Sequence, residues 1–212
     1  MSIAFKEWAL VCEALGSGAQ SIVLRKGGIA EGREGFRFQH PEFFLFPTLF
    51  HEQLAKTTLP PETAAPAGNG RIRISCWARV EWTARIEDLE TARKLTPFHI
   101  WKASVVEERF RYDETPGLHL AFLRVYRLGA PWEFADAPAY GGCRSWVKLP
   151  EPPPDILLEP VLDEPDHAAL DGKLRQTIHV GGDRLPRPAP GSSQAYLATG
   201  GFTFSESTRE NS

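Results

Sequence analysis

Arginine and tryptophan side chains alternate with apolar residues on one stretch of this sequence, and that combination suits one kind of chemistry. From Arg71 to Thr83 every second residue is apolar, which predicts a strand with Arg71, Arg73, Trp77 and Arg79 on its solvent face. Guanidinium groups bind phosphate and an indole stacks on a base, so the pattern favours nucleic-acid binding. An ordinary solvated strand face is the alternative interpretation.

A second cationic stretch ends a short apolar run that begins at residue 21. Arg25 and Lys26 precede Gly27 and Gly28, a pair that turns the chain and whose backbone N–H groups could face an anion. The spacing is not that of a phosphate-binding loop, so a plain tight turn is the alternative. Together with Arg144, these two cations complete the predicted phosphate-binding set.

Histidines and carboxylates gather around an aromatic segment. His40, Thr48 and His51 are predicted to line a recognition pocket beside the cationic face. Imidazole and carboxylate also suit a divalent metal or an acid/base pair, which would use His40, His51 and either Glu31 or Glu42. The spacing of the histidines is no metal signature, and hydrogen-bonded imidazoles in an aromatic loop are the alternative.

Motifs of high specificity for catalysis are missing. A restriction-type nuclease needs an acid-x-Lys triplet on a strand to assemble its metal, and no candidate strand carries one. Cys143 follows two glycines and precedes an arginine, but without a paired histidine it reads as a structural thiol. The sequence therefore predicts no cofactor and no metal, and it leaves open whether the protein is an enzyme.

Composition sets the broad class. The chain has 212 residues, enough for one sizeable domain, and its net charge of -3 divides into +2 for residues 1–150 and -5 for residues 151–212. Such a mildly basic body permits an anionic partner without requiring one. Three widely spaced cysteines, Cys12, Cys76 and Cys143, indicate no disulfide framework and favour a cytoplasmic location. The apolar runs are too short to cross a membrane, and no secretion signal is expected.

Apolar periodicity predicts an α+β domain over residues 1–149, built on a mixed, mainly antiparallel and barrel-like sheet with flanking helices. A Pro-rich acidic tail over residues 150–212, partly disordered, is predicted to carry one helix at 163–178. The body is predicted to contain helices at 3–15, 86–95 and 102–110, strands at 21–26, 36–39, 71–83, 117–128 and 144–149, and a mobile loop at 57–69.

Three segments in this order carry a resemblance to a known family: KEWALVCEALGSGAQSIVLRKGGIAEG, HPEFFLFPT and YGGCRSWV. They resemble the bacterial family catalogued as domain of unknown function 1802, over most of residues 3–149. The family has no known activity. Its occasional association with a Mrr-type restriction endonuclease domain implies a role in DNA metabolism, restriction or defence, with a restriction-type nuclease as a partner.

The order of elements is also similar to that of PUA-like barrels, including the ASCH and EVE branches, which bind RNA or modified bases. This resemblance rests on architecture alone. We therefore expect a module that binds DNA or RNA. The alternatives are a metal-dependent hydrolase or nuclease using His40, His51 and a nearby glutamate, and a scaffold that binds another protein through exposed aromatic side chains.

Overall fold

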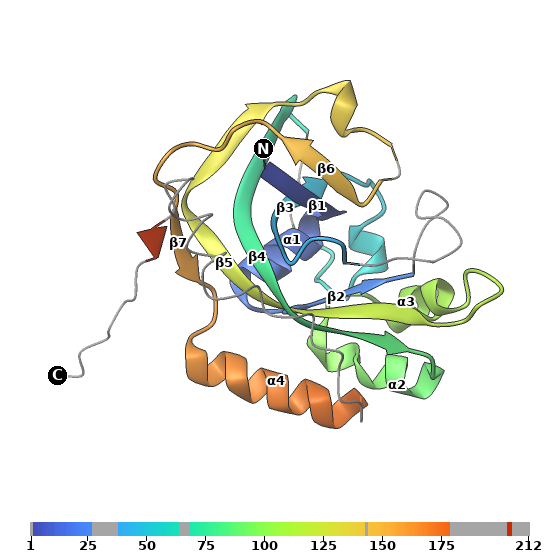
Figure 1. Cartoon of the computed structure of the whole chain (residues 1–212). Coiled ribbons are helices and arrows are strands. Elements are labelled where there is room, and N and C mark those ends of the chain that lie inside the picture. The colour runs from blue at the N-terminus through green and yellow to red at the C-terminus, as the bar shows by residue number, and fades with distance from the viewer. Residues whose placement is uncertain (1, 27–37, 64–67, 143, 179–202, 205–212) are drawn as a thin grey trace.

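One mixed sheet organises the computed structural model, which describes residues 2–26, 38–63, 68–142, 144–178 and 203–204 (Figure 1). In these residues eight strands follow the order β6-β1-β3-β4-β5-β7-β8, with β2 paired to β5. The pairs β1–β3 and β7–β8 are parallel and the others antiparallel. The strands are β1 Ser2–Trp8, β2 Ile22–Arg25, β3 Glu42–Thr48, β4 Arg71–Ile86, β5 Leu118–Ala135, β6 Trp146–Leu149, β7 Leu157–Pro160 and β8 Thr203–Phe204.

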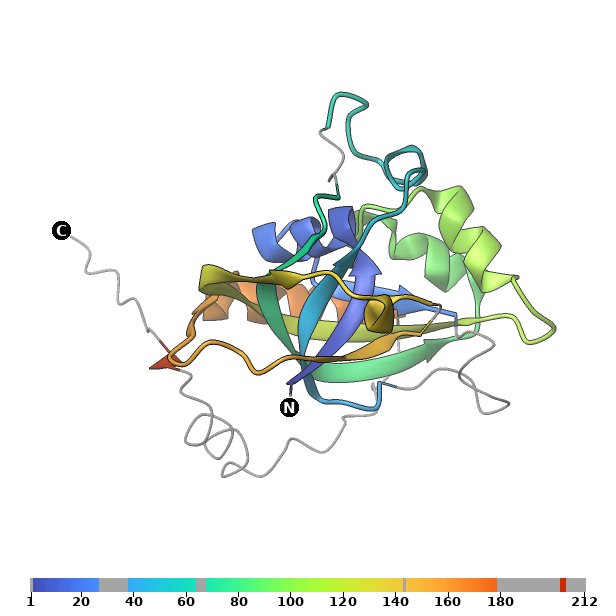
Figure 2. The same ribbon diagram turned by 90° about the horizontal axis from the view of Figure 1, so that it is seen from above.

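The two long strands β4 and β5 curve through the whole sheet, as the view from above shows (Figure 2). The alternation predicted from Arg71 onward is confirmed, because buried and more exposed residues alternate along β4. The pairing of β4 with β5 shifts register twice, between Ile74 and Cys76 and between Val80 and Trp82 of β4. Such bulges bend and twist a strand, which gives the sheet its strong curvature. Among the described strands the sheet stays open, with β6 and β8 at the ends of its path.

Helices flank the sheet. They are α1 Ala9–Ser17, α2 Leu89–Lys94, α3 Ala103–Phe110 and α4 Glu164–Ile178. The Asp88 carboxylate accepts a hydrogen bond of 2.7 Å from the Thr91 backbone N–H, so α2 begins with a side-chain cap. In Figure 2, α1, α2 and α3 are seen on one side of the strands. The expected fold class, a mixed and mainly antiparallel sheet with flanking helices, is confirmed.

The prediction of one helix over residues 3–15 is wrong in its first half. Residues 2–8 form β1, which pairs with β3 on one side and with β6 on the other, and the helix begins only at Ala9. Strand pairing on both edges satisfies the backbone of β1 with partners distant in sequence. Local helical periodicity cannot report such partners, so it extends the helix too far towards the N-terminus.

Two apolar cores fill the fold. The larger packs the sheet against all four helices, and Trp82, Trp101 and Phe122 lie fully buried in it. The smaller includes Phe44 and Trp132 and draws on β1, β3, β4, β5, β6 and β7. The sheet therefore buries side chains on both faces, and few positions remain where a ligand could reach its surface.

The chain continues beyond residue 149 in contact with the body. β7 pairs with β5, so part of the predicted Pro-rich tail adds a strand to the sheet. The predicted helix at 163–178 is confirmed as α4, where the Asp163 carboxylate accepts a hydrogen bond of 2.9 Å from the Asp166 backbone N–H. Leu174 and Ile178 of α4 are buried in the larger core. In the described part of the chain, no helix is long and apolar enough to span a membrane.

Candidate nucleic-acid interface

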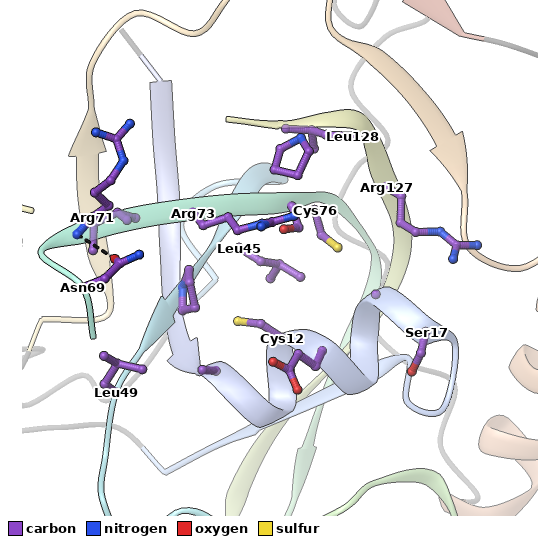
Figure 3. A pocket seen from close by; sticks show the side chains of 17 residues that line it. Cys12, Ser17, Leu45, Leu49, Asn69, Arg71, Arg73, Cys76, Arg127 and Leu128 are labelled. Atoms are coloured by element: carbon purple, nitrogen blue, oxygen red, sulfur yellow. Dashed lines mark hydrogen bonds between the residues drawn. The ribbon is translucent and has the colours of Figure 1, made fainter. Parts of the chain in front are cut away.

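A cleft of about 630 Å³ lies between α1 and the strands β3, β4 and β5 (Figure 3). This volume falls in the range of small-molecule sites and is large enough for a nucleoside. Aliphatic side chains supply much of its wall, and arginines come from two strands. The lining residues with chemical function are Cys12, Glu13, Ser17, Asn69, Arg71, Arg73, Ser75, Cys76 and Arg127, and the aliphatic ones include Leu45, Pro47, Leu49 and Ile72.

An irregularity in the pairing of β4 with β5 lies beside the cleft. Ile74 is buried in the smaller core, whereas Cys76, two residues later, is buried in the larger core beside α1. Between their pairs, a single residue of β4, Ser75, stands opposite residues 128–131 of β5, so β4 passes from one core to the other at this point. As a result Arg71 and Arg73 line the cleft, and Trp77 packs against the opposite, smaller core.

The arginines of the cleft carry more positive charge than their protein partners neutralise. Glu133 lies 3.4 Å from the Arg71 guanidinium and 3.7 Å from that of Arg73, so one carboxylate serves two cations. Both arginine side chains are more than half exposed, and ion pairs of this kind contribute little to stability. Arg127, which is exposed, has no hydrogen bond or ion pair with any described residue. A phosphate could therefore replace Glu133 at small cost.

Thiols line the cleft from both sides, Cys12 on α1 and Cys76 on β4, and α1 also contributes the Glu13 carboxyl. Burial raises the pKa of the Cys12 thiol well above its ordinary value. It also raises the pKa of Cys76 to about 11, against the opposing effect of Arg127. Both thiols are therefore protonated at neutral pH and act as apolar wall rather than as nucleophiles. Partial burial raises the pKa of the Glu13 carboxyl as well, and no described residue pairs with it.

A family model described as Domain of unknown function (DUF1802) matches residues 4–172, which include all of the cleft-lining residues. The chain belongs to this family. The match extends past residue 149 through β7 and most of α4. The resemblance noted in the three sequence segments is thereby confirmed.

Among solved structures, the chain is similar to ASCH from Zymomonas mobilis. The sequences are 10% identical, the alignment covers 86% of this chain and 96% of that one, and the TM-score is 0.43. A mutant of the same ASCH protein aligns at 13% identity over 71% of this chain and 91% of that one, with a TM-score of 0.40. No curated protein matches the sequence.

Two of the cations predicted to contact phosphate are used inside the protein. Arg25 lies 3.4 Å from the buried Glu7 carboxylate and 4.6 Å above the Phe5 ring. The Lys26 ammonium is buried, donates a hydrogen bond of 2.5 Å to the Thr115 carbonyl and lies 3.0 Å from the Asp113 carboxylate. The cause is the position of β2, a buried strand whose C-terminal end lies beside the loop that follows α3. Neither cation joins the cleft, and Gly27 and Gly28 lie outside the described residues.

The predicted pairing of His40 with His51 is not formed. His40 precedes β3 and packs edge-on against Trp146, with ring centroids 4.8 Å apart, while His51 follows β3, is 85% exposed and lies 3.5 Å from Glu52. The seven residues of β3 place them about 20 Å apart. Thr48, between them, donates a hydrogen bond of 2.9 Å to the Glu7 carbonyl. In the described ranges no three His, Cys, Asp or Glu side chains meet as metal ligands would.

The other predicted site residues are dispersed. Trp77 packs on Tyr126, with ring centroids 5.3 Å apart, and Arg79 donates a hydrogen bond of 2.8 Å to Glu81 on that same side of the sheet. Glu42 pairs in register with Arg79 at the far side of the sheet from α1. Arg144 is exposed just before β6 and does not line the cleft. Glu31 and Cys143 lie outside the described residues.

Sequence reasoning missed three residues of the cleft. Arg127 stands near the middle of β5, and it reaches the cleft because it pairs with Cys76 across the bulge. Asn69 lies in the loop before β4, where its side-chain oxygen accepts a hydrogen bond of 3.1 Å from the Arg71 backbone N–H. Glu13 is one of several helical glutamates. The shift in β4–β5 pairing that brings Arg127 to the cleft is not reported by local alternation, and Asn69 and Glu13 belong to no recognisable motif.

Proposed function

We propose that this protein is a nucleic-acid-binding module whose binding site is the cleft between α1 and β4. An unpaired nucleotide enters the cleft with its base against the aliphatic wall formed by Leu45, Pro47 and Leu49. The adjoining phosphates contact the guanidinium groups of Arg71 and Arg73.

The observation that carries this proposal is the presence of three arginines, from β4 and β5, among the lining residues of one largely apolar cleft. Bulk charge does not attract anions to the protein, since its net charge is -3. A local surplus of guanidinium groups therefore has to account for affinity. Glu133 already holds Arg71 and Arg73 in place, so binding phosphate there costs little additional side-chain ordering.

The cleft suits single strands better than duplexes. A base in a duplex is stacked and paired, so it can enter a cleft only after it is flipped out, whereas a single strand presents its bases freely. No aromatic residue lines the cleft among the described residues, so the face of a base packs there on aliphatic side chains. We expect affinity to depend mainly on phosphates and hence strongly on salt.

Fluorescence anisotropy with labelled single- and double-stranded DNA and RNA, from low to physiological salt, tests the proposal. We expect tightest binding to a single strand and a steep loss of affinity with salt. The double variant Arg71→Ala/Arg73→Ala should bind more weakly, and its slope of log affinity against log salt should be shallower by about 1.4. Arg111→Ala removes an exposed arginine of the same charge outside the cleft and should leave affinity nearly unchanged.

Two results would overturn the proposal. One is the absence of binding to all four ligands at low salt. The other is binding that the Arg71→Ala/Arg73→Ala variant weakens by only twice the free energy lost in the Arg111→Ala variant, because each removed charge would then count equally and the attraction would be a property of total charge.

A further inference from the structure

The cleft contains one acidic side chain among its described lining residues, and that side chain has no protein partner. Glu13 stands on α1, across the cleft from the arginines of β4. Although these arginines are positively charged, none of their guanidinium groups lies within ion-pair distance of the Glu13 carboxylate. The Glu13 side chain is exposed to solvent at the cleft, so a ligand that donates hydrogen bonds can take the place of its water.

We propose that Glu13 makes the cleft selective for guanine, an inference that rests on the proposed function of the same site. A carboxylate presents two acceptor oxygens side by side. Guanine presents two adjacent donors, N1–H and the N2 amino group, on its Watson–Crick edge. Adenine and cytosine each place a single amino donor beside an acceptor nitrogen, and uracil and thymine offer one N–H between two carbonyl groups. Guanine alone can therefore satisfy both oxygens of Glu13.

The opposite wall complements the other edge of the same base. Guanine carries two acceptors, O6 and N7, and guanidinium groups are the usual partners of these atoms. Arg127 lines the cleft and has no hydrogen bond or ion pair with a described residue, so it is the arginine left for these atoms once Arg71 and Arg73 contact phosphate. The Glu13 carboxylate on α1 and the Arg127 guanidinium on β5 thus match the donors and acceptors of guanine.

Hypoxanthine supplies the sharpest probe, because it differs from guanine only by the missing N2 amino group. A site built to hydrogen-bond that group rejects the analogue strongly, since one carboxylate oxygen is then left without a donor. We would measure anisotropy at one salt concentration with labelled oligouridylate and oligothymidylate, each carrying a single central guanine, hypoxanthine, adenine or cytosine. The wild-type protein should bind the guanine oligonucleotide about 5- to 150-fold more tightly than the other three.

Glu13→Gln should abolish this preference while keeping salt-dependent binding, because an amide offers one acceptor and one donor in place of two acceptors. The readout is the ratio of guanine to hypoxanthine affinity within each variant, so the general effect of removing a negative charge cancels. Glu108→Gln removes an exposed helical carboxylate outside the cleft and should preserve the wild-type ratio.

The outcomes separate this inference from the function on which it rests. Equal affinity of the wild-type protein for all four central bases would overturn the guanine assignment and leave nucleic-acid binding intact. A guanine preference that survives in Glu13→Gln would overturn the role of Glu13. Failure of every oligonucleotide to bind at low salt would overturn both the inference and the proposed function.

Discussion

Replacement of Leu174 by alanine tests whether α4 belongs to the cooperative core. The Leu174 side chain is fully buried against the larger core, although it lies in the part of the chain that was predicted to be an appended tail. The substitution removes three carbon atoms, and at ~0.8 kcal/mol for each buried methylene the transfer contribution alone is about 2.4 kcal/mol. A residual cavity adds to this, so we expect a loss of about 3 kcal/mol in the free energy of unfolding.

A loss of that size should lower the melting temperature by about 6–12 °C in a domain of this length. Thermal and guanidinium unfolding would be followed by far-UV circular dichroism and by tryptophan fluorescence. The two probes should coincide, because Trp82 of the sheet donates a hydrogen bond of 2.5 Å to Asp171 of α4 and so reports on the same contact.

Gln176→Ala is the matched control, since Gln176 is exposed on the same helix. It should shift the melting temperature by no more than a degree or two. Equal melting temperatures for Leu174→Ala and Gln176→Ala would refute the reasoning. So would two separate unfolding transitions in the wild-type protein, because α4 would then unfold independently of the sheet.

The remaining predictions concern buried polar groups and thiols. Lys26→Met should cost about 2–3 kcal/mol in guanidinium unfolding, because it leaves the Phe110 and Thr115 carbonyls without their charged donor. If Lys26→Met is as stable as the wild-type protein in guanidinium, these hydrogen bonds do not stabilise the fold. Hydrogen bonding by Lys26 lowers the pKa of Asp113 to about 2, so the stability that Asp113 adds is complete above about pH 4 and fades as pH falls towards 2. Asp113→Asn should flatten the melting temperature between those pH values, and parallel curves would refute this. Cys12 and Cys76, with raised pKa values, should resist alkylation at pH 8 in the folded protein and react after unfolding, which mass spectrometry of labelled peptides would check.

Elements with strong local periodicity were predictable. The alternation along β4 and the dipole-matched charges of α2 identify both from sequence, and Asp163 marks the start of α4 with its capping side chain. These signals arise from interactions a few residues apart, which is why composition and spacing report them. The first strand had no such signal, because its partners are β3 and β6.

The site was less predictable than the fold. Arg71 and Arg73 were identified, but their separation from Trp77 depends on the shift in β4–β5 pairing between Ile74 and Cys76. A shift of one residue exchanges the two faces of a strand, so alternation alone assigns side chains correctly only as far as the next bulge. Arg25 and Lys26 failed to reach the cleft for another reason: the sequence shows their charge and conceals the buried carboxylate and carbonyls that surround them.

The pairing of β1 with β3 and β6 affects the order in which the sheet can form during synthesis. Ser2 pairs with Leu149 of β6, while Ala4 pairs with Phe44 of β3, so β1 gains its β6 partner long after its β3 partner, when the chain has been extended as far as Leu149. During synthesis its β6 edge stays unpaired, and contacts between such distant residues form slowly. We therefore expect the growing chain to depend on protection of that edge until β6 arrives, and truncation before Trp146 to yield an aggregation-prone product.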